Sequence, residues 1–277
     1  MSEKHKLQYL IELIDDSTEE VRTEVLKELN KYGTSLEQDL LSYSDILNTE
    51  RMNLLQPVIN SIRQKWLINT WESWQNLNDY YDRIESVLSI IAKYQYGIHN
   101  KYDLTRILDF ITEDFMNRTP YGDELDLAYF LFKEKGISGS KEDYYNPLNS
   151  NAVYAIKEKK GLPITLSLIF ILIGNRLGYK VFGCNFPGHF LAKVDLDDEI
   201  ILVDCFNNGK IIYEEEFNSL LNNSHESVRK IIYDDIHPDV IIKRILNNLV
   251  TAYSYANDSQ NHKLFSDLNN NTPYKSL

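Results

Sequence analysis

The feature that most constrains the fold of this chain is a long apolar run, "GLPITLSLIFILIGNRLG", at residues 161–178. Pro163 suits the first turn of a helix, where its missing N–H loses no hydrogen bond, and Gly178 is typical of a helix end. The residues between them are apolar on nearly all sides, and the run is shorter than the roughly 20 residues that span a bilayer. The run therefore predicts a central helix, buried beneath other elements.

Helical patterns precede this run and strand patterns follow it. Apolar residues recur at helical spacing over 104–115, 125–135 and 239–255. Directly after the buried run, four segments are rich in β-branched and aromatic residues, as strands are: "KVFGCNF", "HFLAKVDL", "EIILVDCF" and "KIIYEEEF". The chain is therefore expected to be a helix-rich α+β protein.

The chain is expected to have three regions. Residues 1–98 read as helices, and within them a helix, a short acidic turn, a second helix and a glycine resemble one unit of a HEAT-type repeat. Residues 99–217 carry the buried helix and the strands, and we expect them to form the core. Residues 218–277 return to helix and are expected to pack on that core.

The overall charge excludes several kinds of partner. The formal net charge is −12 and the pI is about 5.0, so clustered Lys and Arg for nucleic acid or for an anionic membrane surface are not expected. The N-terminal "MSEKHKLQYLIELIDD" has no apolar signal core, and the 2 cysteines lack metal-ligand spacing. We therefore expect a cytoplasmic protein that needs no metal and no other cofactor. The sequence does not indicate its oligomeric state.

A histidine follows the buried run, directly after a Pro-Gly pair. If Asp195–Asp198 form a four-residue loop, Val194 pairs with Glu199, and the same antiparallel register sets His189 opposite Asp204. Opposed residues share a face, so the carboxylate of Asp204 would orient the imidazole, as in a nucleophile–His–Asp triad. The alternative interpretation is a partly buried, hydrogen-bonded histidine without a chemical role.

Three side chains are candidate nucleophiles for such a pair. Cys184 falls on the face of His189 if Pro187–Gly188 form the turn. Thr165 lies in the first turns of the buried helix, although a hydroxyl there is a weaker nucleophile than a thiol. Cys205 adjoins the carboxylate on the same strand and therefore points to the opposite face. Each of them also has an ordinary interpretation as a packing or first-turn residue, so spacing leaves the nucleophile open.

The segments "GLPITLS", "FPGHFL" and "DCFNNG" together resemble the SirB-type transglutaminase-like proteins, a bacterial family with a relative inside a eukaryotic F-box protein. The resemblance is strongest over residues 103–210 and extends more weakly over the rest of the chain. It implies a papain-like α+β core, in which a central helix packs on an antiparallel sheet. It also implies that N- and C-terminal helices wrap this core.

In the broader superfamily a Cys at the start of the central helix, a His on one strand and an Asp on the next form a triad. The resemblance places the His at His189 and the Asp at Asp204. It places the nucleophile position on or beside Pro163, and no Cys lies near it. The resemblance therefore implies that transamidase and thiol-protease activity is lost, and that Pro is usual at this position in the SirB branch.

Two hypotheses about function follow. The first is a degenerate transglutaminase-fold protein that holds a partner protein or peptide around His189 and Asp204. The second is an amide or ester hydrolase, or an acyl transferase, in which the His–Asp pair serves a relocated nucleophile, Cys184 or Thr165. The residues expected to line the binding groove are Asn149, Ser150, Gly188 and Asn207.

Overall fold

The computed structural model describes residues 3–186, 188–196, 199–221 and 232–273. The chain divides into two compact units. Met1–Glu72 and Lys93–Lys101 form the first unit, and Ser73–Ala92 and Tyr102–Leu277 form the second unit. The three regions expected from the sequence, with boundaries at residues 98 and 217, stay a prediction.

The first unit is a set of helices around an apolar core. Leu7 and Ile11 of its first helix are buried against residues of the later helices, such as Leu29 and Leu55. The last long helix begins where the side chain of Asn48 accepts a hydrogen bond from the backbone N–H of Arg51, so a free helix-end donor is satisfied. The HEAT-like assignment of this region stays a prediction. The helices are α1 (Glu3–Glu12), α2 (Glu19–Asn30), α3 (Leu36–Leu40) and α4 (Thr49–Thr70).

The second unit places helices around a four-stranded sheet, and α5 (Tyr80–Tyr96) contributes its residues 80–92 to it. The further helices are α6 (Leu104–Arg118), α7 (Glu124–Tyr129), α8 (Ala152–Glu158), α9 (Pro163–Leu177), α10 (Glu214–Leu221), α12 (Pro238–Tyr255) and α13 (Ser259–Asn271). The sheet strands are β3 (Val181–Cys184), β4 (Leu191–Leu196), β5 (Glu199–Asp204) and β6 (Lys210–Ile212). Two short strands, β1 (Ser138–Gly139) and β2 (Lys160–Gly161), pair in parallel apart from this sheet.

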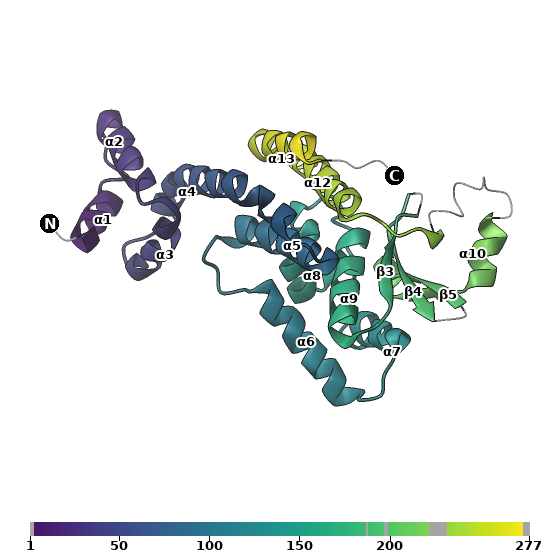
Figure 1. Ribbon diagram of the computed structural model, residues 1–277. Helices are drawn as coiled ribbons and strands as arrows, with labels where there is room; N and C mark the ends of the chain where they lie inside the picture. The colour runs from purple at the N-terminus through teal and green to yellow at the C-terminus, as the bar shows by residue number, and fades with distance from the viewer. Residues whose placement is uncertain (1–2, 187, 197–198, 222–231, 274–277) are drawn as a thin grey trace. The chain divides into compact units, whose positions relative to one another are not determined.

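The central helix α9 lies in the middle of the second unit (Figure 1). It begins at Pro163, and Gly178 ends it with φ +76°, the left-handed conformation that glycine adopts without strain. Residues 163–174 are all buried, because α6, α7 and α8 contact the helix as well as β3 and β4. The expected buried helix in a helix-rich α+β fold is confirmed. Within the described residues no helix, α9 included, is both long and apolar enough to cross a bilayer.

The sheet is antiparallel, with the strands in the order β3-β4-β5-β6. Its β4–β5 pairing corrects the predicted register, because Leu196 pairs with Glu199 and Val194 pairs with Ile201. The ladder thus continues through Asp195 and Leu196, which adds backbone hydrogen bonds that a four-residue loop would forgo. Residues 197–198 of the predicted loop lie outside the described part of the chain.

The predicted strand "KIIYEEEF" is a strand only at its start. Lys210–Ile212 pair with β5, and helix α10 begins at Glu214. Three glutamates occupy the first turn of α10, where carboxylates interact favourably with the partial positive charge of a helix N-terminus. The side chain of Glu216 also accepts a hydrogen bond from the backbone N–H of Tyr213, 3.1 Å away. These acidic residues therefore favour helix over a longer strand.

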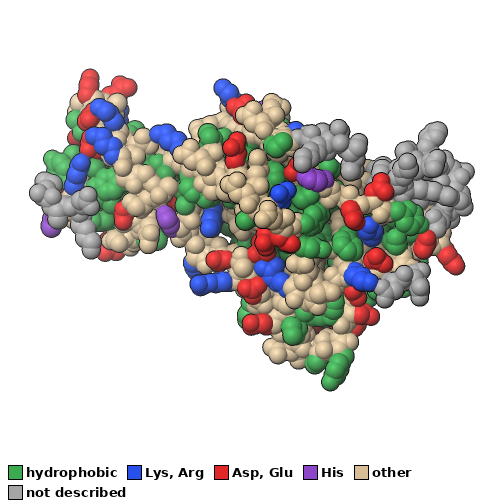
Figure 2. Space-filling view, viewed as in Figure 1, with side chains coloured by type: hydrophobic (Ala, Val, Ile, Leu, Met, Phe, Trp, Pro, Cys, Tyr) green, Lys and Arg blue, Asp and Glu red, His purple; other side chains and the backbone are tan. Residues whose placement is uncertain are grey.

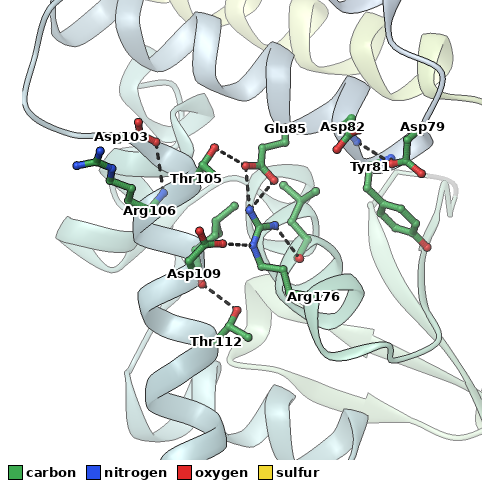
Figure 3. A network of polar contacts seen from close by, with 12 residues as sticks. Asp79, Tyr81, Asp82, Glu85, Asp103, Thr105, Arg106, Asp109, Thr112 and Arg176 are labelled. Carbon is green, nitrogen blue, oxygen red and sulfur yellow. Dashed lines mark hydrogen bonds and ion pairs between the residues drawn. The ribbon is translucent and has the colours of Figure 1, made fainter.

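A polar network joins α5, α6 and α9 on one side of the second unit (Figure 3). The guanidinium of Arg176, near the end of α9, lies 2.8 Å from the carboxylate of Glu85 and 2.8 Å from that of Asp109. Glu85 also accepts a hydrogen bond from the hydroxyl of Thr105 at 2.6 Å. Arg176 further donates to the carbonyl of Leu172. One arginine thus links three helices that are distant in sequence.

Replacing Arg176 by Met is expected to lower the free energy of unfolding by about 2 kcal/mol, since it leaves the largely buried carboxylate of Glu85 without its cation. The matched control is Arg118→Met, which breaks an exposed pair with Asp114 within one helix and should cost about 0.5 kcal/mol or less. Urea unfolding monitored by circular dichroism measures both losses. Equal losses in the two variants would contradict a structural role for the three-helix network.

Candidate functional site

His189 and Asp204 come together at one end of the sheet. His189 lies two residues before β4, and its backbone N–H donates to the carbonyl of Phe186 at 3.0 Å. Gly188 has φ +75°, so this bend suits a residue without a side chain. Asp204 is the last residue of β5, and its Oδ1 lies 2.8 Å from Nε2 of His189. Pro187, the other residue of the predicted turn, lies outside the described residues.

The pair forms although the register differs from the predicted one. The observed pairing is shifted by two residues from the predicted one. If the ladder is extended by one residue beyond the pair of Ala192 with Val203, Asp204 lies opposite Leu191 rather than opposite His189. Side chains alternate between faces with a period of two, so a two-residue shift leaves the face of each residue unchanged. The bend before β4 then brings the imidazole to the carboxylate.

The carboxylate of Asp204 is held from three directions. Its Oδ1 accepts the backbone N–H of Asn207 at 3.1 Å, and its Oδ2 accepts the side-chain amide of Asn207 at 2.8 Å. Burial opposes ionisation, but the hydrogen bonds from His189 and Asn207 outweigh it and lower the pKa of Asp204 below its usual value. Asn207, predicted to bind a partner, therefore positions the carboxylate.

The ionised carboxylate determines how the His189 ring is used. A carboxylate only accepts hydrogen bonds, so Nε2 carries the proton that points to Asp204. Nδ1 has no hydrogen-bond partner among the described residues, and the side chain is 27% exposed. The ring of Phe206 stands edge-on to the imidazole, with 6.0 Å between ring centroids. The site thus offers one oriented nitrogen that can accept a hydrogen bond from outside the protein.

Acid should remove the contribution of Asp204 to stability. Its pKa is lower in the folded protein than the unfolded value of about 3.9, so the stabilisation is complete above pH 4 and is lost as the pH falls through the folded pKa. We expect Asp204→Asn to lower the free energy of unfolding at pH 7. At pH 3 the difference in this free energy between the variant and the wild type should be smaller. Urea unfolding at both pH values tests this, with the exposed Asp267→Asn as control. A difference that is the same at both pH values would show that the charge is not responsible.

The candidate nucleophiles are all buried. Pro163 begins α9, and Thr165 in the same turn is 1% exposed. Neither cysteine is part of a disulfide, and burial raises the pKa of Cys184 to about 11 and that of Cys205 to about 12. Cys184 packs in an apolar cluster with residues such as Leu191. A neutral, buried thiol is a poor nucleophile, because the thiolate is the reactive form.

Two of the predicted binding residues lie in the turn just before α8. Asn149 and Ser150 are each 1% exposed, and their role in binding a partner stays a prediction. The side-chain amide of Asn149 donates to the backbone carbonyl of Tyr144 at 3.1 Å. The backbone carbonyl of Asn149 accepts from the backbone N–H of Leu162, just before α9. Burying this loop requires partners for its backbone groups, and Asn149 supplies them. It therefore fixes the loop at residues 143–150 against the start of α9.

A row of aromatic rings, not predicted from the sequence, extends from His189. The centroid distances are 6.0 Å from His189 to Phe206, 5.9 Å from Phe206 to Tyr144 and 5.3 Å from Tyr144 to Tyr145. Tyr145 stacks on Tyr255 of α12 at 3.7 Å. The three tyrosines are 39–62% exposed. We call these five rings the aromatic row.

One weak signal for this row was present in the sequence. Gly139 lies in the irregular segment before α8, and a Cβ built there would meet the ring of Phe206. A glycine at such a position marks a close approach by another part of the chain. The sequence alone does not say which residue approaches.

Other features of the described residues do not add to this site. Two cavities, of about 690 Å³ and about 410 Å³, are lined by residues other than His189 and Asp204. No group of three or more His, Cys, Asp or Glu side chains within the described ranges could hold a metal ion. Acidic and basic side chains are interspersed on the face that Figure 2 shows.

Comparison with known proteins gives one family profile and two kinds of relative. Residues 102–247 match the sequence profile described as the transglutaminase-like superfamily. A UPF0162 protein of Xylella fastidiosa (strain 9a5c) is 33% identical over 135 residues, which cover 46% of this chain and 48% of that protein. A UPF0162 protein of Vibrio cholerae is 29% identical over 92 residues, or 33% of this chain and 34% of that protein. F-box only protein 21 of Homo sapiens is 25% identical over 202 residues, or 69% of this chain and 32% of that protein.

The match to the Xylella relative spans about half the length of that protein, and the match to the human relative about one third. No solved structure matches the chain significantly. The profile match contains the His189–Asp204 pair, Phe206 and Tyr144, whereas Tyr255 lies beyond its end.

Proposed function

This chain belongs to the transglutaminase-like superfamily, and we propose that it is a SirB-type member that holds a peptide segment of a partner protein and performs no thiol chemistry. One observation carries the proposal. The central helix starts with Pro163 where the resemblance implies a catalytic Cys, and both thiols of the chain are buried with a raised pKa. An acyl-transfer site needs an accessible nucleophile beside its base, and these residues supply none.

The His189–Asp204 pair takes a binding role in this proposal. Asp204, which Asn207 holds in place, fixes the imidazole in one tautomer, so Nδ1 of this partly exposed ring is an oriented acceptor for a backbone or side-chain N–H. The other four rings of the aromatic row supply rigid apolar surface next to His189. Exposed tyrosines of this kind are frequent in interfaces, because they bury a large surface and lose few rotamers. Together they suit an extended peptide with a polar backbone and apolar side chains.

The hydrolase alternative requires a nucleophile that approaches His189. Thr165 and Cys184 are each at most 1% exposed, and the pKa of the Cys184 thiol is raised to about 11 by burial. Among the described residues, the side-chain hydrogen bond of His189 goes to Asp204 and not to either of these residues. The alternative therefore has less support than peptide binding.

Selection of random 12-residue peptides displayed on phage tests the proposal. We expect wild-type protein to enrich peptides whose affinity falls about tenfold in the Tyr144→Ala variant, as for a central aromatic contact. The matched control is Tyr121→Ala, which removes a fully exposed tyrosine of the same unit and should leave affinity unchanged. If no enriched peptide distinguishes Tyr144→Ala from Tyr121→Ala, this surface is not a peptide site.

A further inference from the structure

Arg244 of α12 stands beside the aromatic row. Its guanidinium donates to the side-chain carbonyl of Asn185 and lies 5.4 Å from the centroid of the Phe190 ring. Asn185 and Phe190 flank the bend that carries His189, so Arg244 lies on the same side of the second unit as the His–Asp pair.

Within the described part of the chain, Arg244 lacks the carboxylate partner that several other arginines have, although Arg22 and Arg83 likewise donate to carbonyl oxygens. Arg51, Arg118 and Arg176 each contact a carboxylate at 2.8 Å. Among the described residues, no carboxylate lies within ion-pair distance of Arg244, although the chain has 41 acidic and 29 basic residues. The side chain is partly buried, and this burial lowers the pKa of the guanidinium.

A partly buried cation without an anion is costly, and a ligand anion would offset that cost. A guanidinium has five N–H donors, and the carbonyl of Asn185 takes only part of this capacity. The remaining donors match a carboxylate, which can accept two of them in parallel. Asn185 and Phe190 also restrict the guanidinium, so less conformational entropy is lost when an anion binds.

Helix α12 continues the same surface toward Tyr255. Residues 244, 248, 251 and 255 recur at intervals of three and four and therefore share one face of the helix. Asn248 of this face is partly buried, and Thr251 and Tyr255 are exposed. Tyr255, the last ring of the aromatic row, stacks on Tyr145. Arg244 and Tyr255 of the aromatic row thus lie on one face of α12.

We propose that Arg244 selects peptides that carry an Asp or Glu side chain next to a large apolar residue, with the acid at Arg244 and the apolar residue on the aromatic row. This inference rests on the peptide-binding function proposed above and specifies its partner. A polyanion such as RNA fits less well, because the net charge of −12 repels it, whereas one peptide carboxylate needs one cation.

Two phage libraries of 12-residue peptides test the inference, one with all amino acids and one without Asp and Glu. On wild-type protein we expect the complete library to enrich an acidic residue at one fixed position, and the acid-free library to enrich at least tenfold less. Arg244→Gln should weaken acid-bearing clones about tenfold. Arg244→Glu should instead select Lys or Arg at that position, and Arg244→Lys should keep the preference for acid. Arg106→Glu, at an exposed position on α6, makes the same change in charge and should alter nothing.

The outcomes separate the two proposals. Clones that depend on Tyr144 but bind equally without an acid, or within twofold on Arg244→Gln, would overturn the acidic preference and leave peptide binding intact. The absence of any Tyr144-dependent clone would instead overturn peptide binding itself. Binding of oligo(dT) that is lost in Arg244→Gln would assign the surface to nucleic acid. A concentration-dependent dimer that is lost in that variant would assign it to a second copy of this chain. Thermal melting of each variant confirms that it is folded.

Discussion

The Leu168→Asp variant is expected not to fold its second unit. Leu168 lies in the middle of α9 and is fully buried, and the helix is covered on all sides by α6, α7, α8 and the sheet. An unpaired carboxylate at this position would have no polar partner and no route to water, and its burial costs several kcal/mol or more. The lost packing of the leucine adds about 2–5 kcal/mol. Together these costs approach or exceed the about 5–15 kcal/mol by which a domain is typically stable.

The measurement is the yield of soluble protein and its thermal transition by circular dichroism. Leu41→Asp is the matched control, because it makes the same change at a leucine that is 76% exposed and should change stability by about 0.5 kcal/mol or less. Leu168→Ala gives an intermediate case, with an expected loss of about 2–5 kcal/mol and a cooperative transition. A soluble Leu168→Asp protein that melts cooperatively like the control would contradict the assignment of α9 as the central core helix.

The central helix was predictable because its signals are local. Pro163 and Gly178 fix its ends through backbone geometry, and a run that is apolar on every side has one stable location in a water-soluble protein. No tertiary information enters that argument. The fold class follows from the same reasoning, since strand-rich segments after a buried helix must cover it.

The sheet register was predicted incorrectly, and yet the pairing of His189 with Asp204 did not depend on it. Register depends on where the ladder ends, and the loop signal at residues 195–198 did not decide between two and four residues. The face of the sheet to which a side chain points changes only when the register shifts by an odd number of residues, and the two registers differ by two. Contacts that require only that two side chains share a face of the sheet are therefore more predictable than contacts that require one exact register.

The aromatic row and Arg244 could not be predicted from spacing. Tyr144, Phe206 and Tyr255 lie on a loop, after a strand and at the end of a helix, and only the packed fold brings their rings together. The sequence does indicate that tyrosines are abundant, with 19 in the chain, but most tyrosines pack without function. The partners of Arg244 are separated from it by more than 50 residues. Such contacts carry no periodic signal.

Both thiols are expected to react far more slowly than an ordinary cysteine. With a pKa of about 11, only about 1 in 10⁴ Cys184 side chains is a thiolate at pH 7, and Cys205, with a pKa of about 12, is about tenfold lower. An unperturbed cysteine, with a pKa of about 8.5, is a few per cent thiolate at that pH. We therefore expect iodoacetamide to label both residues at least 100-fold more slowly than an exposed thiol. The rate in the His189→Ala variant should be the same, because no ion pair with the imidazole activates either sulfur.

Mass-resolved labelling at pH 6 and pH 7 measures each cysteine separately. A Tyr121→Cys substitution at a fully exposed position of the same unit gives the ordinary rate within one molecule, and labelling in urea shows that both native thiols react when unfolded. Labelling of Cys184 at or above the rate of the introduced cysteine, lost in His189→Ala, would mean a working Cys–His dyad. In that case Cys184 would have to become accessible through a conformational change, and hydrolase chemistry would replace peptide binding as the interpretation of the site.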